Sequence, residues 1–513
     1  MEFDGILISP IFLVLILLST LILFFFRWNN NKSKNPWGLL PGPSGLPIIG
    51  NLHQLGKHPH ISLYSLAKRY GSIFYLRLGE IPTVILSTPE MAKEAMKIHD
   101  VALATRPPLF AAKYLFYDCT DVAFAPYGAH WRHVRKICIL ELFSAKRVQS
   151  YGFVREEEAA KLVERIAESH PGITNLSKCL NQYANGVLCR IVFGKDFNGG
   201  GEYDRLGFQE MLNEYQELLG GFSIGDFFPS MEFVHRITGL KSRLLHAFER
   251  FDKFFDDVID EKMKKRLLSS SWSSKEHKDF VDILLEVQQD EGAELPLTMD
   301  NVKAILLDMF AAGTDTTFIT LDWAMIELIT NPKKLEKAQS EVRSVVGKKK
   351  YVSESDLPNL HYLKAVIKEV YRLHPPAPVL LPRESMEDIA IGEYKIPEKT
   401  RVFINAWAVG RDPKSWTNPA VFEPERFLNS DIDFKGQDFE LIPFGAGRRS
   451  CPAITFGSAS VEIGLAQMLQ SFDWELPPGI RASDLDMTEV FGITMHRKDA
   501  MMALAKPYSP PAI

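Results

Sequence analysis

The segment LIPFGAGRRSCPAITFGSAS, Leu441 to Ser460, places one cysteine behind a phenylalanine, two glycines and two arginines. Gly445 and Gly447 permit a tight backbone turn, which leaves peptide N–H groups free to point at the Cys451 sulfur. The guanidinium of Arg449 can donate two charge-assisted hydrogen bonds to one carboxylate. These residue types suit a thiolate that ligates haem iron, although a cysteine near glycines is more often an inert structural residue. The choice depends on the rest of the chain.

The size, charge and cysteine content of the chain exclude several classes of protein. Its 513 residues contain no long low-complexity linker in the middle, which favours one large globular unit. The balance of 59 basic against 64 acidic residues argues against a nucleic-acid partner. The five cysteines are scattered and form no C-x-x-C pair, which disfavours zinc ribbons, iron–sulfur clusters and a disulfide framework.

The N-terminus carries an apolar segment, Gly5 to Phe26, that is long enough to span a bilayer, for which roughly 20 residues suffice. Arg27, Lys32 and Lys34 follow it, so the positive-inside rule places the remainder of the chain in the cytosol. A cleavable signal peptide is the alternative, but the apolar run is too long and the charges have the wrong order. We predict a membrane signal anchor over residues 1–27, a proline-rich hinge over 28–50 and a catalytic domain over 51–513.

Most of the remaining sequence predicts helix. The pattern from Met299 to Thr330 is apolar on nearly all faces, which indicates a central buried helix, with Thr298 or Asp300 as its cap and Asn331-Pro332 as its stop. Short strand-like runs predict a small sheet region: Ile73 to Leu78, Thr83 to Leu86, Ala390 to Ile396 and Arg401 to Ile404. The predicted fold class is therefore mainly α with a small β-rich region.

The middle of this long helix contains AAGTDTT, Ala311 to Thr317, which breaks the local rules for a buried helix. Glycine weakens the helix, threonine hydroxyls compete for its carbonyls, and a carboxylate is costly to bury. Exceptions of this kind often mark a functional site. On these residues alone, a kink whose hydroxyls bond to the preceding turn is an equally good interpretation.

The string KEVYRLHPP carries a carboxylate and a guanidinium at helical spacing. Glu369 and Arg372 are three residues apart and share one face of a helix that Pro375 and Pro376 end. A surface ion pair is the commoner explanation of such a doublet. Both groups would be costly to bury unless they are paired.

The string WRHVRK presents two pairs of side chains on different faces of a helix. Trp131 and Arg135 are four residues apart and face one way, while Arg132 and Lys136 face a direction about 100° away. An ordinary solvated basic face is the alternative to a functional role.

Together these strings resemble the signatures of the cytochrome P-450 superfamily. The residues that resemble its haem-binding loop are Phe444, Gly445, Gly447, Arg449 and Cys451. Ala453 departs from the pattern, because the family usually has glycine there. The resemblance implies the cytochrome P-450 fold, haem b as cofactor and Cys451 as the axial iron ligand. It also implies that Phe444 covers the proximal face and that Arg449 reaches a haem propionate.

The other strings extend the resemblance. The residues that resemble the family's oxygen-binding helix are Ala312, Gly313, Asp315, Thr316 and Thr317. The resemblance implies that Gly313 makes room for dioxygen, that Thr316 positions the oxygen and its water, and that Asp315 supplies protons to them.

Further charged residues resemble known elements of the family. Those that resemble propionate contacts are Trp131, Arg135 and Arg383, and those that resemble a structural Glu-Arg-Arg network are Glu369, Arg372 and Arg426. We expect Arg132 and Lys136 to project to the proximal surface and to dock an acidic flavoprotein, NADPH-cytochrome P-450 reductase. By family position, the substrate contacts come from Leu109 to Val122, Leu218 to Phe228, Met309 to Ala312, Ala377 to Leu380 and Phe491 to Thr494.

The particular forms AGTDTT, PERF and PFGAGRR resemble the plant microsomal group of specialised metabolism, and Ala125 to Val148 resembles its monoterpene and sesquiterpene hydroxylases. We therefore expect a monooxygenase, anchored by a single pass in the endoplasmic reticulum membrane, that hydroxylates a hydrophobic small molecule, with a terpenoid as the leading hypothesis. An alkaloid, phenolic or flavonoid oxidase is the alternative within the family. A reductase-independent haem-thiolate isomerase or dehydratase, and a tethered haem or lipid carrier, are disfavoured by the presence of Asp315 and Thr316.

Overall fold

The computed structural model describes residues 19–20, 40–197, 205–221, 223–268, 277–290, 292, 295–490 and 492–509. The predicted anchor lies outside the described residues except for Ser19 and Thr20, and so does the part of the predicted hinge from 28 to 39.

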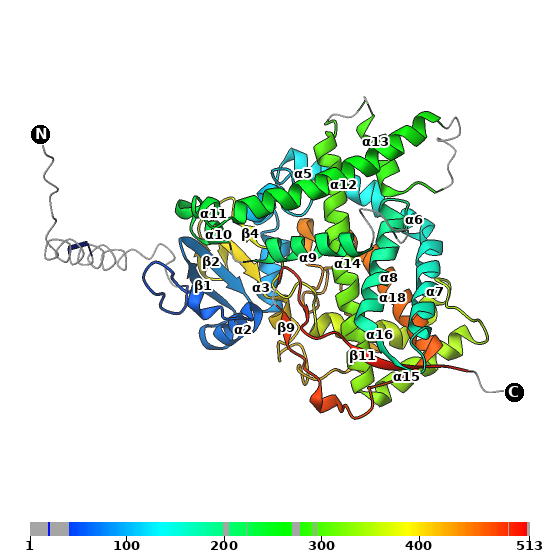
Figure 1. The fold of residues 1–513 in the computed structure, drawn as a ribbon. Coiled ribbons are helices and arrows are strands. Elements are labelled where there is room, and N and C mark those ends of the chain that lie inside the picture. The colour runs from blue at the N-terminus through cyan, green and yellow to red at the C-terminus, as the bar shows by residue number, and fades with distance from the viewer. Residues whose placement is uncertain are drawn as a thin grey trace, which may run out of the picture.

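Helices form most of the molecule and surround one long central helix, α14, Met299–Thr330 (Figure 1). The helices before it are α2 Pro59–Tyr70, α3 Pro89–Lys93, α4 Phe110–Leu115, α5 Ala129–Ile137, α6 Ala145–Ser150, α7 Gly152–Ala167, α8 Leu176–Val192, α9 Arg205–Gly220, α10 Ile224–Phe227, α11 Val234–Ile237, α12 Leu240–Leu268 and α13 Phe280–Gln288. Those after it are α15 Pro332–Val346, α16 His361–Leu373, α17 Ala406–Val409 and α18 Ile454–Ser471.

Short helical turns connect these elements. The 3-10 turns are η1 Leu52–Gln54, η4 Pro229–Met231, η6 Leu357–Asn359, η7 Pro424–Phe427, η8 Gly447–Arg449 and η9 Ala482–Asp484. Single π turns, η2 Glu94–Ile98 and η3 Cys138–Leu142, extend α3 and α5.

The bounds of α14 agree with those predicted from the sequence. The Thr298 hydroxyl accepts a hydrogen bond from the Asn301 amide at 3.2 Å, and the Asn301 side chain accepts one from the Thr298 amide at 3.1 Å, which closes a capping box. Asn331 ends the helix before Pro332. Among the described residues, α14 is the one helix long and apolar enough to cross a membrane. Its most apolar window is 72% buried inside the protein, as expected for a core helix.

A four-stranded sheet lies at one end of the molecule, beside α2, in the order β1-β2-β7-β4 (Figure 1). Its strands are β1 Ile73–Leu78, β2 Ile81–Leu86, β7 Arg401–Ile404 and β4 Arg383–Glu384. β2 pairs with β7 in parallel, and the other two pairings are antiparallel. Segments more than 300 residues apart in sequence therefore meet here, and β4 carries Arg383 toward the molecular centre.

The remaining strands form small antiparallel units. They are the hairpin of β5 Ile389–Ile391 and β6 Tyr394–Ile396, the sheet of β3 Ile173–Asn175, β11 Met502–Pro507 and β8 Phe472–Glu475, and the pair β9 Glu489–Val490 with β10 His496–Arg497. The predicted single strand from Ala390 to Ile396 is wrong. Gly392, at φ +58°, turns the chain in the middle of this run and makes it a hairpin.

The described part of the proline-rich segment, residues 40–50, is attached to the catalytic domain. The Tyr75 amide donates to the Pro41 carbonyl at 2.8 Å, and Gly50 forms a bridge with Leu78. Leu40 belongs to the apolar core that the sheet shares with α3. Residues 40–50 therefore pack against β1 and the core of the sheet.

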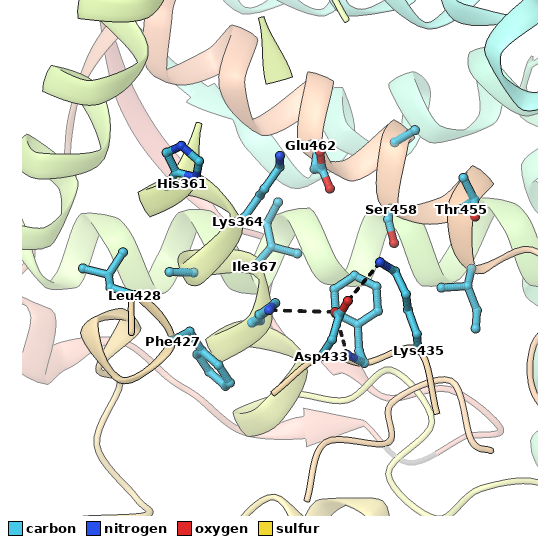
Figure 2. A pocket seen from close by; sticks show the side chains of 15 residues that line it. His361, Lys364, Ile367, Phe427, Leu428, Asp433, Lys435, Thr455, Ser458 and Glu462 are labelled. Carbon is cyan, nitrogen blue, oxygen red and sulfur yellow. Dashed lines mark hydrogen bonds and ion pairs between the residues drawn. The ribbon is translucent and has the colours of Figure 1, made fainter. Parts of the chain in front are cut away.

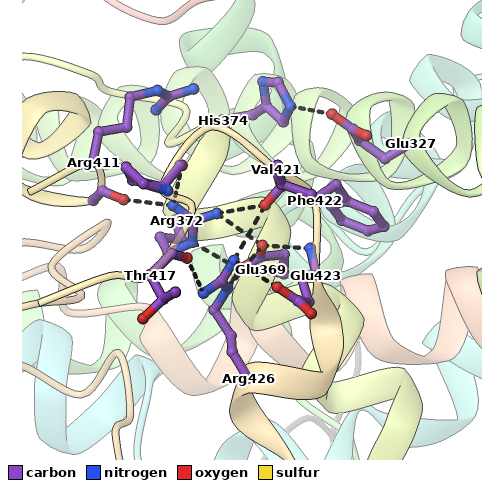
Figure 3. A network of polar contacts seen from close by, with 12 residues as sticks. Glu327, Glu369, Arg372, His374, Arg411, Thr417, Val421, Phe422, Glu423 and Arg426 are labelled. Atoms are coloured by element: carbon purple, nitrogen blue, oxygen red, sulfur yellow. Dashed lines mark hydrogen bonds and ion pairs between the residues drawn. The ribbon is translucent and has the colours of Figure 1, made fainter. Parts of the chain in front are cut away.

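A buried charged network fixes α16 to the segment that leads to η7 (Figure 3). Glu369 accepts hydrogen bonds from Arg372 Nε at 2.7 Å and Nη2 at 2.8 Å, and from Arg426 Nε at 3.1 Å. Glu369 is fully buried, and Arg372 is 1% exposed. The surface ion-pair interpretation of this doublet is therefore wrong, and the buried network is confirmed.

Backbone carbonyls complete the network. Arg372 donates to the carbonyls of Gly410 and Pro419 at 2.7 Å each, and to that of Val421 at 3.1 Å. The two arginines thus join α16 to Gly410 and to the stretch 417–426, which leads into η7. Because all donors of Arg372 are satisfied, its charge is tolerated in the interior.

Replacing Glu369 with alanine should leave two guanidinium groups without their anion and lower the free energy of unfolding by about 3–5 kcal/mol. Urea unfolding followed by fluorescence measures this loss. Glu423→Ala is the matched control, because it removes the other carboxylate near Arg426, at 3.5 Å, from a side chain that is 46% exposed. The control should cost less than about 1 kcal/mol. Equal losses in the two variants would contradict the assignment.

Candidate active site

A cavity of about 300 Å³ lies in the centre of the helical region. It is bounded by α14 from Asp308 to Thr317, by the segment 443–457 that contains Cys451, and by the segment from Phe116 to Phe124. Residues 376–381 and the turn at Ile493 and Thr494 complete the wall. The cavity therefore touches parts of all five segments expected to contact substrate, while Phe491 lies outside the described residues.

The Cys451 loop is held by hydrogen bonds within itself and by contact with the preceding part of the chain. The Cys451 amide donates to the Phe444 carbonyl at 2.9 Å, which closes the loop. Gly447 has φ +70°, and a Cβ there would collide with the Met96 carbonyl and the Asp100 carboxylate. Glycine at this position is therefore required both by the backbone conformation and by the close approach of η2.

Ala453 occupies the position where the resemblance suggests glycine. Its backbone has φ −102° and ψ 23°, which alanine adopts without strain, and it is the first residue before α18. The Ala453 amide hydrogen-bonds toward the Cys451 sulfur and lowers its pKa. The substitution of alanine for glycine thus preserves both the turn and the amide that faces the sulfur.

Burial dominates the electrostatics of Cys451. Removal from water raises the pKa of its thiol, while the Ala453 amide and the Arg135 guanidinium lower it. A thiolate here accordingly needs a cation of its own, such as a bound metal ion.

Phe444 lies at the cavity wall beside the cysteine and forms one end of an aromatic cluster. Its ring contacts those of Tyr371, at 5.1 Å between centroids, and Phe434, at 5.5 Å. Edge-to-face and tilted contacts of this kind are favourable arrangements of aromatic rings. Phe444 therefore presents an apolar ring at the cavity wall.

Four arginines border the cavity: Arg106, Arg135, Arg383 and Arg449. Burial, together with repulsion from its neighbours, lowers the pKa of Arg449 to about 9. Burial lowers the pKa of Arg383 to about 10, against a partly opposing effect of Asp100. Such a concentration of buried positive charge favours an anionic ligand at this edge of the cavity.

The contacts of these side chains differ in part from the predicted ones. Arg449 donates to the carbonyls of Ala104 and Ala125, and its guanidinium lies 4.1 Å from the ring centroid of Trp131. Trp131 is buried and directs its indole N–H to the Val122 carbonyl at 3.0 Å, and it is not among the residues that line the cavity. Trp131 therefore supports Arg449 directly.

The other two predicted arginines do reach the cavity. Arg383 donates to the Ala446 carbonyl at 3.0 Å and lies 3.6 Å from Asp100, while Arg135 donates to the Ser450 hydroxyl at 3.3 Å. Both therefore brace the Cys451 loop from outside as well as lining the cavity.

The sequence pattern does not single out Arg106. It is 7% exposed and donates to the carbonyls of Leu381 and Pro382 at 2.8 Å each. A lone arginine before two prolines has no periodicity and no charged neighbour in sequence. Only the long-range fold shows that it belongs to the same cationic edge.

The opposite wall of the cavity is α14, which contributes Gly313 and Thr316 to the lining. Thr316 lines the cavity and donates its hydroxyl to the Ala312 carbonyl at 2.8 Å. Gly313 also lines the cavity, and a Cβ there would lie 2.7 Å from a methyl of Leu188, so it also permits the close approach of α8. The Thr316 hydroxyl thus bonds to the preceding turn, and the same side chain lines the cavity.

Asp315 does not line the cavity itself but lies behind it. Its carboxylate accepts a short hydrogen bond from the hydroxyl of Thr494, which does line the cavity. Burial raises the pKa of Asp315, and the Thr494 hydroxyl and His496 partly oppose this effect. A carboxyl group that retains a proton more readily than usual is suited to supply protons to the cavity.

A second cavity, of about 540 Å³, lies between α16, α18 and residues 427–435, and it shares no lining residue with the first (Figure 2). Its lining includes the charged residues Lys364, Lys368, Asp433, Lys435 and Glu462 among apolar side chains. Asp433 lies 3.0 Å from Lys435 and 3.9 Å from Lys368, so these three charges are paired. This cavity has no sulfur ligand, and the chemistry belongs to the first one.

The residues of the first cavity fit a haem. One wall offers a single soft sulfur ligand, the interior is lined largely by aromatic and aliphatic side chains, and one edge is cationic, as two propionates require. Cys451 would hold the iron, and Arg135, Arg383 and Arg449 would hold the propionates. The fold and this site together define a haem-thiolate protein.

Comparison with known proteins agrees with this class. Residues 40–504 match the family described as cytochrome P-450. A cytochrome P-450 of Prunus mume, 71AP13, is 64% identical over 490 residues, which are 96% of this chain and 94% of that protein. A solved structure of a zebrafish cytochrome P-450 with abiraterone has a TM-score of 0.75 at 26% identity, over 88% of this chain and 100% of that chain.

Two further relatives have names that state their activity. Phenylacetaldehyde oxime monooxygenase of Prunus mume is 47% identical over 98% of this chain and 95% of that protein. Premnaspirodiene oxygenase of Hyoscyamus muticus is 44% identical over 97% of this chain and 98% of that protein. The chain belongs to the cytochrome P-450 family and is a plant monooxygenase of that family.

Replacing Ala453 with glycine should change little, because the backbone there needs no positive φ. We expect a change in unfolding free energy of no more than about 0.5 kcal/mol and no shift in the absorption maximum of the ferrous carbon monoxide complex. Gly447→Ala is the control and should lower the yield of haem-loaded protein. A shifted absorption maximum in Ala453→Gly would show that the methyl group disturbs the sulfur.

Proposed function

We propose that this monooxygenase binds haem b through Cys451 and hydroxylates a hydrophobic terpenoid. The observation that carries the proposal is the placement of Cys451 and Thr316 on the walls of one largely apolar cavity with a cationic edge. A protein that only carried haem or lipid would have no use for a hydroxyl and a buried carboxyl next to the site.

A haem with a thiolate ligand supplies the activation of dioxygen for transfer of one oxygen atom to the substrate. The protein residues supply position and protons. Rotation of the Thr316 side chain away from the Ala312 carbonyl turns its hydroxyl toward the cavity. Asp315, which accepts a hydrogen bond from the Thr494 hydroxyl, is the proton donor behind it.

Two observations support a terpenoid substrate. Much of the cavity is formed by hydrocarbon side chains, among them Phe116, Val122 and Leu219, which suit a substrate with few polar groups. In addition, one relative over nearly the whole chain is named as a premnaspirodiene oxygenase. The alternative is an aryl oxime, because a relative of comparable similarity is named for phenylacetaldehyde oxime.

We also propose that the electrons come from NADPH through cytochrome P-450 reductase at the endoplasmic reticulum membrane. Arg132 and Lys136 are exposed on α5, while Arg135 of the same helix faces the Cys451 loop. A reductase docked on these cations would therefore lie one helix away from the cysteine. The uncharged segment from Gly5 to Phe26 supports an N-terminal membrane anchor.

The Thr316→Ala variant should bind haem normally but waste reducing equivalents. Product formed per NADPH should fall roughly tenfold or more, with a matching rise in hydrogen peroxide. Thr317→Ala is the matched control, since the Thr317 hydroxyl donates to the Gly313 carbonyl in the same way at 2.9 Å. Equal uncoupling in both variants would assign the effect to helix distortion and remove the role of Thr316.

The double variant Arg132→Glu/Lys136→Glu should raise the KM for reductase at low salt by about threefold or more, and high salt should reduce the difference. Steady-state NADPH oxidation at varied reductase concentration measures it. The control is Lys68→Glu/Arg69→Glu, which reverses two exposed cations on α2 beside the sheet. An unchanged KM in the α5 variant would remove the docking proposal.

The substrate proposal is tested with microsomes that contain the protein and a reductase. They are incubated with a panel of terpenes, alkaloids, flavonoids and aryl oximes under isotopically labelled dioxygen, and the products are identified by mass spectrometry. A terpene product that carries one labelled oxygen and requires NADPH is expected. A product that forms without NADPH would indicate an isomerase, and turnover of the oxime alone would favour the alternative.

A further inference from the structure

Two carboxyl groups meet in the wall of the active-site cavity. Asp308 lies on α14 and lines the cavity, and Asp121 lies in the segment Phe116–Ala125, which covers it. Asp121 is fully buried and Asp308 is 6% exposed. In the part of the chain that the structure describes, neither carboxyl group forms an ion pair with a lysine, arginine or histidine.

These carboxyl groups hold three successive amides of the covering segment. Asp308 Oδ2 accepts from the Val122 amide at 2.7 Å. Asp121 Oδ2 accepts from the Ala123 amide at 3.1 Å and from the Phe124 amide at 2.9 Å. The side chains of Val122 and Phe124 line the cavity, so the position of these amides determines its shape.

The two carboxyl groups lie close together, because the Val122 amide that donates to Asp308 belongs to the peptide that follows Asp121. Among the described residues, Asp121 Oδ1 is buried without a hydrogen-bond partner. An ionised carboxylate oxygen that is buried without a partner is costly, so burial favours a proton on one member of the pair. If both were ionised in this buried site, they would repel each other. We propose that Asp121 and Asp308 share one proton and that the pair clamps residues 116–125 onto α14, which makes Asp308 a positioning residue for substrate selection.

The role of Asp308 in substrate selection rests on the proposed function, because it requires that the substrate binds in this cavity. The clamp itself follows from the contacts of α14 with the covering segment. It explains why a carboxylate occurs one turn before the AAGTDTT string, at a position where an apolar side chain would fill the cavity wall equally well.

The groups that face the pair come from several elements. They are Cys119 of the covering segment, Cys138 of η3, Tyr215 of α9, and the cations Arg106 and Arg449. Burial raises the pKa of Cys119 and of Cys138 to about 12, and it raises that of Tyr215 as well, so these three groups are neutral near pH 7. The two arginines direct their donors to backbone carbonyls.

The shared proton gives the clamp a defined dependence on pH. Burial, with repulsion from Asp121, raises the pKa of Asp308, and burial also raises that of Asp121. The folded pair therefore keeps a proton that the separated carboxyl groups release. The clamp is intact below the raised pKa of the pair and weakens as the pH rises through it, when the second carboxyl group ionises.

Hydrogen–deuterium exchange of the purified haem-loaded enzyme tests the clamp directly. In the wild type, exchange of peptides covering residues 116–125, corrected for intrinsic rates, should accelerate as the pH rises from about 6 to about 9.5. Asp308→Asn can accept from the Val122 amide and donate to Asp121 without a shared proton. It should keep the protection and lose the pH dependence. Asp308→Leu should raise exchange about tenfold at every pH.

A second measurement reports on selectivity without turnover, so its outcome is independent of the proposed reaction. Optical titration compares clotrimazole, a bulky azole, with imidazole. Asp308→Leu should weaken clotrimazole binding about fivefold or more and leave imidazole binding unchanged, while Asp308→Asn should resemble the wild type. Asp300→Asn, at an exposed position in the first turn of α14, controls for the loss of one charge on the helix.

Three outcomes would overturn the proposal. They are exchange that does not depend on pH in the wild type, exchange in Asp308→Asn that equals that of Asp308→Leu, and equal effects of Asp308→Leu on both azoles. None of the three measurements needs turnover, and the first needs no variant. The proposal therefore remains falsifiable even if Asp308→Leu does not fold.

Discussion

The active site depends on the burial of one cysteine, Cys451, next to a cluster of buried cations. Cys451 lies in a loop that Gly447 allows to pass close under η2, and the loop is closed by the bond from the Cys451 amide to the Phe444 carbonyl. Burial alone raises the pKa of the thiol, so the site is suited to sulfur only when a metal ion compensates. Burial also disfavours the charged form of the four arginines around it, because it lowers their pKa values. A bound haem would compensate both effects: its iron ion would stabilise the thiolate, and its two propionates would neutralise the arginines.

The other wall shows how one helix can be both a core element and a catalytic one. α14 is capped, long and largely buried, and its stability comes from contacts along its whole length with neighbours such as α8. This support lets the AAGTDTT string tolerate a glycine and three threonines. Each hydroxyl of Thr316, Thr317 and Thr320 donates to the carbonyl four residues earlier, which keeps the helix intact while polar groups face the cavity.

Features set by local rules were predictable from the sequence, and features set by long-range contacts were not. The cap at Thr298 and the stop at Asn331-Pro332 gave the bounds of α14, because both signals lie next to the helix ends. The prediction of one strand from Ala390 to Ile396 is wrong, because Gly392, at positive φ, turns the chain there. Resemblance located Cys451, Arg383 and Arg449, but not their bonds to distant carbonyls. The pairing of Asp121 with Asp308 joins residues far apart in sequence, so no periodicity could indicate it.

The central claim is that Cys451 ligates iron through its sulfur. X-ray absorption at the iron edge of the purified, haem-loaded protein tests this claim without any substrate or reductase. The wild type should show a sulfur scatterer in the first coordination shell, and Cys451→Ser should lose it while Cys138→Ser, which changes a buried cysteine away from the loop, retains it. A first shell of the wild type that contains only nitrogen and oxygen would contradict the assignment of the site.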